Sequence, residues 1–151
     1  MNLQMEINSL KQRVAELEKQ VEQEKEFPQE DDMFWFINIF GKPIGSTLGE
    51  STTNKQLIEI GNIFKTEEQA EFAVEKLKVE AELRKFSRPF EYGKFNHYLF
   101  LDIDGDSFRT DFTSYCPPQG AIYFESEEKA QQAISTVGEE RIKKYIFGVE
   151  D

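Results

Sequence analysis

The sequence holds little of what disulfide frameworks, metal sites and nucleic-acid-binding proteins require. It contains one cysteine, Cys116, and one histidine, His97, among 151 residues. An internal disulfide, a Cys-x-x-Cys redox pair and a zinc site built from Cys and His are therefore excluded. Basic residues are also scarce, because 18 Lys and Arg stand against 29 Asp and Glu and leave a formal net charge of −11. This charge repels nucleic-acid phosphates, so we do not expect direct nucleic-acid binding.

Long apolar runs are absent as well. No run is long enough to cross a membrane, and the N-terminus lacks the basic and then apolar pattern of a secretion signal. We therefore expect a cytoplasmic protein without membrane contact. With 38% apolar and 13% aromatic residues, a chain of this length can fill one modest core and an appendage, but not two independent cores.

The N-terminal segment carries an unbroken heptad pattern. Apolar residues recur at spacings of four and three, and they are Leu3, Ile7, Leu10, Val14, Leu17 and Val21. β-Branched residues occupy the a positions and Leu occupies the d positions, which is typical of a coiled coil. Glycine and proline are absent before Pro28, so we predict an oligomerisation helix over residues 1–26 and an acidic linker over residues 27–32.

Charged residues beside this seam favour parallel helices in register. In that arrangement Glu6 of one helix faces Lys11 of the next, and Arg13 faces Glu18. The a and d residues favour a dimer, whereas the segment from Arg13 to Glu18 resembles the Arg-apolar-x-x-apolar-Glu pattern of short trimeric coiled coils. Dimer and trimer both stay open. The alternative is an amphipathic helix packed on its own domain, although its apolar stripe would be wider than this one.

The remainder of the chain contains two similar halves. Residues 35–44 align with residues 99–108, and residues 63–74 align with residues 123–134. The two matches occur in the same order and at similar offsets. We therefore predict a degenerate internal duplication.

Each half has the pattern of two strands joined by a Gly-containing turn, a short third strand and a helix. The helices are expected to start after Thr66 and Ser126, whose hydroxyl groups suit the N-cap position. We predict an α+β domain over residues 33–151, built from repeats of about 33–88 and 95–149, in which a mainly antiparallel sheet packs against two helices.

The helices and one loop can be placed more closely. We expect a first helix over residues 67–86, and a second helix that starts near residue 127 and is interrupted at Gly138. Residues 46–56 are rich in Ser, Thr, Gly and Asn and are expected to form a mobile loop. The inner face of the first helix is expected to hold Ala70, Ala73, Val74, Leu77, Ala81 and Leu83.

Three alternating aspartates, Asp102, Asp104 and Asp106, follow an apolar run. The segment resembles the Asp-x-Asp-Gly-Thr signature of haloacid-dehalogenase-type phosphatases. Asp106 replaces the Thr of that signature, and the chain that follows is too short for the parallel sheet of that family. An EF-hand loop needs its glycine at position six, whereas Gly105 falls at position four. We interpret the segment as a hairpin turn and predict neither a metal site nor a cofactor.

Aromatic residues are numerous, with 14 Phe, 5 Tyr and 1 Trp. Most of them must fill the core, but alternation along the strands leaves some exposed. As candidate partner-binding or ligand-binding residues we name Arg84, Lys85, Arg88, Tyr92 and Trp35. The alternative is a well-filled core beside a basic helix end that complements the helix dipole.

Residues 59–78 and 137–148 resemble segments of a group of small phage and prophage proteins of Gram-positive bacteria whose activity is uncharacterised. The resemblance covers most of residues 33–149. Members of this group often carry a heptad-bearing or acidic N-terminal segment. The resemblance implies a phage accessory protein, with anti-defence proteins such as anti-CRISPR inhibitors as the nearest functional class, and it implies no catalytic residue.

We therefore expect a non-enzymatic homo-oligomer that binds and inhibits a host defence protein. Neither His97 nor Cys116 has a neighbour in sequence that would activate it for catalysis. Two alternatives stay open. One is a protein that binds or sequesters a small ligand such as a nucleotide, and the other is a component of virion assembly.

Overall fold

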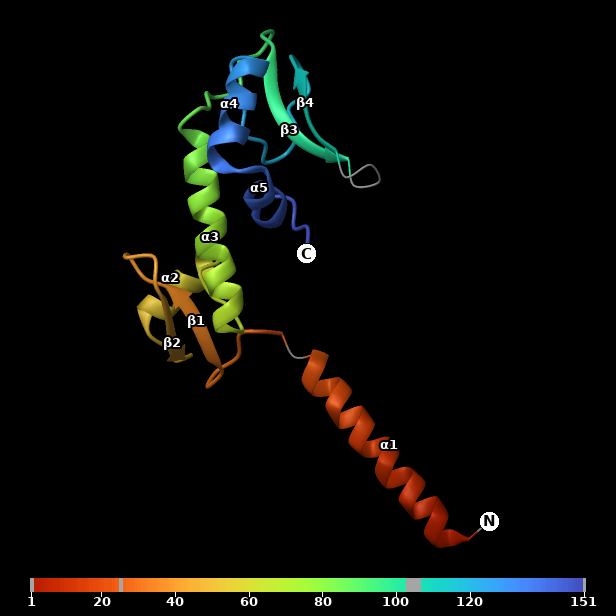
Figure 1. Ribbon diagram of the computed structural model, residues 1–151. Coiled ribbons are helices and arrows are strands. Elements are labelled where there is room, and N and C mark those ends of the chain that lie inside the picture. Colours follow the sequence, from red (N-terminus) through yellow and green to blue (C-terminus); the bar gives the residue numbers. More distant parts are fainter. Residues whose placement is uncertain (1, 25, 103–106, 151) are drawn as a thin grey trace. The chain divides into compact units, whose positions relative to one another are not determined.

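The structure is a computed structural model that describes residues 2–24, 26–102 and 107–150. These ranges contain five helices and four strands (Figure 1). The chain belongs to the α+β class, as its sequence predicts. It divides into two compact units, Met1–Glu67 and Glu68–Asp151.

The first unit begins with helix α1 (Leu3–Glu24), which matches the predicted N-terminal helix and ends two residues before the expected boundary. Asn2 caps its start, because the Asn2 side-chain oxygen accepts a hydrogen bond of 3.1 Å from the Gln4 backbone N–H. The side chains of α1 that the structure describes are all exposed. Helix α1 therefore forms without burying its apolar residues.

A hairpin follows in the same unit. Strand β1 (Met33–Ile37) pairs antiparallel with β2 (Pro43–Thr47), and Trp35 lies opposite Gly45. Gly41 occupies the turn with a φ of 74°, a conformation that glycine adopts without strain. The predicted Gly-containing turn is therefore present.

The predicted third strand of this half is reduced to one residue. Phe64 pairs with Trp35 through two backbone hydrogen bonds of 2.8 Å. Two residues earlier, the Asn62 amide donates a hydrogen bond to the Ile37 carbonyl and accepts one from the Ile37 N–H, both at 2.8 Å. A side chain thus continues the ladder in place of backbone.

The expected loop over residues 46–56 is only partly a loop, because helix α2 (Thr52–Glu59) begins inside it. The Ser51 hydroxyl caps this helix by accepting a hydrogen bond of 3.2 Å from the Asn54 N–H. Ser, Thr and Asn are common in loops, but they are also the residues that start helices. The composition of the segment alone could not separate these two outcomes.

The second unit repeats the hairpin. Strand β3 (Asn96–Asp102) pairs antiparallel with β4 (Ser107–Thr113). The third segment contributes two bridges, one between Tyr123 and Arg88 and one in which Phe124 and His97 exchange backbone hydrogen bonds of 2.8 and 3.0 Å. Instead of the one sheet that we expected, the described residues form two separate two-stranded sheets.

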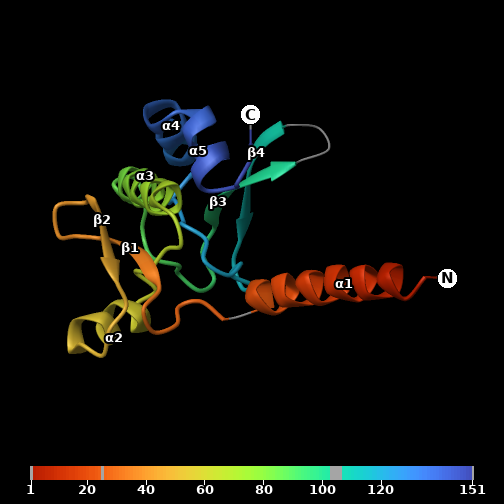
Figure 2. The same ribbon diagram turned by 90° about the horizontal axis from the view of Figure 1, so that it is seen from below.

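Three helices complete the chain. Helix α3 (Glu67–Arg84) starts directly after Thr66, helix α4 (Glu127–Val137) is capped by Ser126, and α5 (Glu139–Tyr145) follows Gly138. Gly138 has a φ of 104°, which ends α4. These three boundaries agree with the prediction. In both views, α4 lies beside the hairpin of β3 and β4 (Figures 1 and 2).

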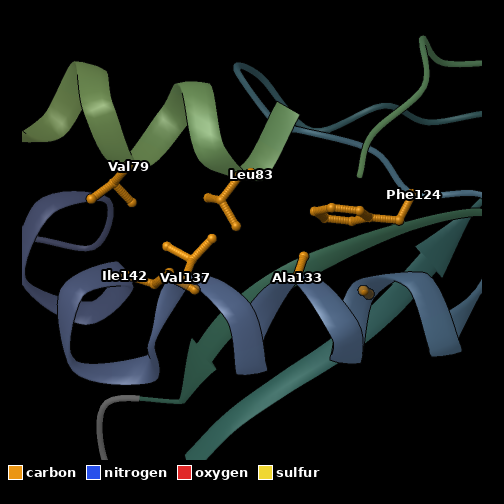
Figure 3. Packing of buried hydrophobic residues seen from close by; sticks show 7 residues of the cluster. Val79, Leu83, Phe124, Ala133, Val137 and Ile142 are labelled. Atoms are coloured by element: carbon orange, nitrogen blue, oxygen red, sulfur yellow. The ribbon is translucent and has the colours of Figure 1, made fainter. Parts of the chain in front are cut away.

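The core of the second unit joins α3 to α4 and α5. Figure 3 shows Val79 and Leu83 directed from α3 towards α4. The predicted inner face was wrong for Leu77 and Ala81, which are exposed. Apolar residues lie on every side of α3, so their spacing does not single out one face. The cluster consists of Val79, Leu83, Phe124, Ala130, Ala133, Val137 and Ile142.

Candidate interaction surfaces

The first candidate surface is the apolar seam of α1. The six heptad residues lie on one side of the helix because their spacing follows its turn. Their side chains are between 44% and 75% exposed, so the described chain leaves this seam uncovered. On its flank, Arg13 pairs with Glu16 of the same helix at 3.6 Å. The seam comprises Leu3, Ile7, Leu10, Val14, Leu17 and Val21.

The second candidate surface consists of two pairs of exposed aromatic rings in the second unit, which we call the aromatic platform. It consists of Tyr92, Phe95, Phe112 and Tyr115, each between 52% and 79% exposed. Tyr92 packs edge-on against Tyr115, with ring centroids 5.0 Å apart, and Phe95 packs edge-on against Phe112 at 4.9 Å. Exposed aromatic groups of this kind are characteristic of protein-binding surfaces.

Buried polar contacts hold the loop that carries two of these rings, Tyr92 and Phe95. Asn96 is fully buried, and its side chain bonds the backbone of Glu91, Lys94 and Thr113 at 2.9 Å. The Arg88 guanidinium donates to the Asn96 side-chain oxygen at 2.7 Å. It also donates to the carbonyl groups of Pro89 and Phe95, at 3.0 and 2.9 Å. The loop therefore presents its aromatic rings in a fixed arrangement, which lowers the entropy cost of binding.

The third candidate surface is a pocket of about 390 Å³ in the second unit. Its polar rim includes Glu80, Arg84 and Tyr98. The Arg84 guanidinium lies 3.4 Å from the Glu80 carboxylate. The apolar wall includes Leu83, Leu99, Ile122, Phe124, Ile146 and Phe147.

The structure separates the five residues named from the sequence as a binding site. Arg84 lines the pocket, Tyr92 belongs to the aromatic platform, and Arg88 holds the loop beneath that platform. Lys85 is exposed next to Arg84. Trp35 belongs to the first unit, where its ring lies over Gly45, so that a Cβ at that position would approach it to 3.3 Å.

Other residues in these surfaces escaped the sequence analysis. Phe95, Phe112 and Tyr115 gave no signal beyond their aromatic character. Asn96 and Asn62 gave none, because their partners lie up to 17 and 25 residues away in the sequence. A polar residue directly before or after an apolar run is the one feature that could have drawn attention to them.

The predicted aspartate turn lies mostly outside the described residues. Asp102 ends β3, but Asp104, Gly105 and Asp106 are not among the residues that the structure describes, and neither is Lys25 of the heptad flank. His97 is engaged through its backbone with Phe124, and its ring lies 5.7 Å from that of Phe112. Cys116 is exposed.

No protein-family model, curated protein or solved structure matches this chain. Among the described residues, no helix is both long and apolar enough to span a membrane. The physical features of the three surfaces therefore carry the functional argument.

Proposed function

We propose that this chain is a non-enzymatic, self-associating phage accessory protein that binds and inhibits a host protein. The observation that carries the proposal is the exposed seam of α1. Apolar side chains at a and d positions gain stability only when a partner helix covers them. A second or third copy of the same helix fits the spacing of the seam and the charges at its flanks.

The flanking charges support a parallel arrangement. With helices in register, Glu6 and Arg13 of one chain lie beside Lys11 and Glu18 of the next, so both interchain pairs are attractive. An assembly of this kind carries several identical copies of the α+β domain of residues 33–151, which we call heads. Several heads raise the affinity for a partner that offers more than one binding site. The net charge of −11 suits a partner with a basic surface.

We also infer that the two halves of the chain arose by duplication. In both halves a hairpin is followed by a phenylalanine that forms an antiparallel bridge with the first strand, Phe64 or Phe124, and then by a helix. When Phe64 is matched with Phe124, the bridges match Trp35 with His97. The sequence alignment instead matches Trp35 with Leu99, so the two ways of matching the hairpins differ by two residues. A shift of two keeps every side chain on the same face of the strand. Each copy therefore preserves the same inward and outward pattern.

A substitution in the seam tests self-association. Val14→Asp places a charge at an a position and is expected to convert the assembly to monomers, as measured by native mass spectrometry or sedimentation equilibrium. Gln12→Asp adds the same charge on the opposite side of α1 and serves as the matched control. A wild-type chain that stays monomeric at the highest soluble concentration would contradict the proposal.

Partner binding is tested at the aromatic platform. Replacing Tyr92 and Tyr115 with Ser removes two exposed rings without touching the Asn96 contacts, and it is expected to weaken inhibition of the target by at least tenfold. Phe40→Ser removes an exposed ring from the turn of the first unit and is the control. Equal inhibition by all three proteins would exclude the platform as the binding surface.

The alternative of a nucleotide-binding protein has weaker support. Arg84 is the one Lys or Arg among the described residues that line the pocket, and it already lies 3.4 Å from Glu80. A nucleotide phosphate usually requires several donors or cations that are not paired with a carboxylate. The pocket suits a ligand that is mainly apolar.

A further inference from the structure

The strand β3 has an edge that is only partly paired. Each residue of β3 lies opposite a residue of β4, but the N–H and C=O of His97 point away from β4 and bond Phe124. Backbone groups alternate along an antiparallel strand, so Leu99 must direct its N–H and C=O to the same side as His97. Among the described residues, none bonds the Leu99 backbone groups on that side.

The equivalent edge of the first unit is closed. Ile37 stands two residues after Trp35, as Leu99 stands two residues after His97, and both Ile37 backbone groups bond the Asn62 amide. The residue that corresponds to Asn62 in the second unit is Ile122, because each precedes the bridging phenylalanine by two positions. An isoleucine side chain cannot form these hydrogen bonds. The edge of β3 therefore stays open where the edge of β1 is capped.

The pocket of the second unit lies beside this open edge. Leu99 and Ile122 both line it, together with Leu83 and Phe147. The site combines two unsatisfied backbone groups with an apolar cavity. A peptide that adds a strand satisfies both features, since its backbone bonds the edge and its alternate side chains reach one side. A small apolar molecule would leave the Leu99 groups without partners.

We propose that the second unit binds an extended peptide segment of the partner protein, which pairs with β3 at Leu99 and places one apolar side chain in the pocket. The peptide continues the pairing that His97 and Phe124 begin. At the rim, Arg84 lies 3.4 Å from the Glu80 carboxylate, so the side chain that enters the pocket meets mainly apolar residues. This assignment rests on the proposed function, because it names where a partner protein is held.

The first test selects peptides on the full-length protein from a displayed library of peptides of about seven residues, a usual strand length. The enriched peptides are expected to share one apolar residue at a fixed position. The best one is then synthesised and added while amide hydrogen exchange is followed. Binding is expected to slow exchange of the Leu99 amide at least tenfold and to leave that of Tyr98 unchanged. Failure to enrich any peptide, or binding that leaves Leu99 exchange unchanged, would overturn the proposal.

Backbone pairing is tested on the peptide itself, which leaves the protein intact. N-Methylation of a peptide residue that faces β3 removes a donor and adds bulk at the edge. We expect at least about fivefold weaker binding for each such residue, which corresponds to one lost hydrogen bond. N-Methylation of the neighbouring residues, which face away from β3, is the matched control. Equal effects at both sets of positions would show that no strand is added.

Protein variants test the comparison with the first unit. Ile122→Asn supplies the side chain that closes the edge of β1, and it is expected to abolish peptide binding. Ile122→Val keeps an apolar side chain and an open edge, so binding is expected to persist. Lys85→Ala, beside Arg84 but outside the pocket, is expected to leave peptide binding unchanged. Should Ile122→Asn fail to fold, the N-methylated peptides still decide the outcome.

The proposal of a peptide site and the proposal of self-association can be refuted independently of each other. The Val14→Asp variant is expected to bind the selected peptide with the affinity of wild type, because one head carries the whole site. Loss of assembly with retained peptide binding would leave this proposal standing. Displacement of the peptide by ATP would overturn it in favour of a small-ligand pocket.

Discussion

The two units hold a third segment against a hairpin by different means. In the first unit, the Asn62 amide ties that segment to the edge of β1, and the buried apolar residues of the unit are Phe34 and Leu48. In the second, Phe124 is fully buried in a cluster of seven residues, and no amide takes the place of Asn62. In the first unit, where little apolar surface is buried, a side-chain hydrogen bond holds the third segment against β1. In the second unit, apolar packing holds the third segment, and the corresponding edge of β3 stays open.

The largest effect on stability is expected from a substitution in the apolar core of the second unit. Phe124→Ala removes a fully buried ring and is expected to lower the free energy of unfolding of the second unit by about 3–5 kcal/mol. Urea denaturation followed by circular dichroism measures the change. Phe64→Ala, at the corresponding half-buried position of the first unit, is the control and should cost less. Equal losses would show that the two units rely on packing to the same degree.

A second prediction concerns the buried amide of the second unit. Asn96→Ala removes the side-chain hydrogen bonds to the backbone of Glu91, Lys94 and Thr113 and one of the three acceptors of the Arg88 guanidinium, and it is expected to cost about 3 kcal/mol. Asn96→Asp turns a carboxylate oxygen towards the carbonyl groups of Glu91, Lys94 and Thr113 at a buried position, so its cost should be at least as large if these hydrogen bonds are responsible. Proteolysis within residues 89–95 provides an independent readout. A stable Asn96→Ala variant with an intact loop would contradict this role.

The amide of the first unit is expected to have a smaller effect. Asn62→Ala leaves the Ile37 N–H and C=O unpaired, at an expected cost of about 2 kcal/mol and with faster exchange of the Ile37 amide. The fluorescence of Trp35, the one tryptophan of the chain, follows unfolding of this unit. Gln56→Ala, at an exposed position of α2, is expected to be neutral. Unchanged Ile37 exchange in Asn62→Ala would show that the amide does not close the edge.

The smallest effect concerns an ion pair between α3 and α5. Arg141 donates to both carboxylate oxygens of Glu82, at 2.6 and 3.3 Å, and this hydrogen bonding lowers the pKa of the Glu82 carboxyl from its ordinary value of 4.5. A lowered pKa adds stability above pH 4.5, which is lost as the pH falls through the folded value. Both side chains are 39% exposed, so solvent screens the pair.

Glu82→Gln tests this pair. The variant is expected to be slightly less stable than wild type at pH 7, by under about 1 kcal/mol, and the difference should vanish in acid. Melting temperatures measured across the pH range provide the comparison. Glu16→Gln removes the carboxylate that pairs with exposed Arg13 of α1 and is the control. A difference that persists in acid would exclude the charge of Glu82 as its cause.

Local signals explain what the sequence predicted. The heptad spacing located α1, the residues Thr66 and Ser126 marked the starts of α3 and α4, and Gly138 marked the break between α4 and α5. Each signal acts within one or two helical turns. The α+β class followed from these elements together with the apolar and aromatic runs of the strands.

The missed features depend on residues that are distant in sequence. The bond between Asn62 and Ile37 spans 25 positions, and the contacts of Asn96 join a loop to the end of β4. Helix α2 was missed because its residues suit loops and helix starts equally. Of the aromatic platform, the sequence indicated Tyr92 but not its partner Tyr115, since only the hairpin brings them within contact.

The length of α1 has a consequence for mass action. A helix of 22 residues offers about three heptads, close to the shortest length at which such helices pair in water. Association at this limit depends steeply on protein concentration, since the dimer population rises with the square of the free monomer. The number of heads per particle would then follow the abundance of the protein in the cell. A weak seam would thus make the number of chains in the proposed assembly dependent on the expression level.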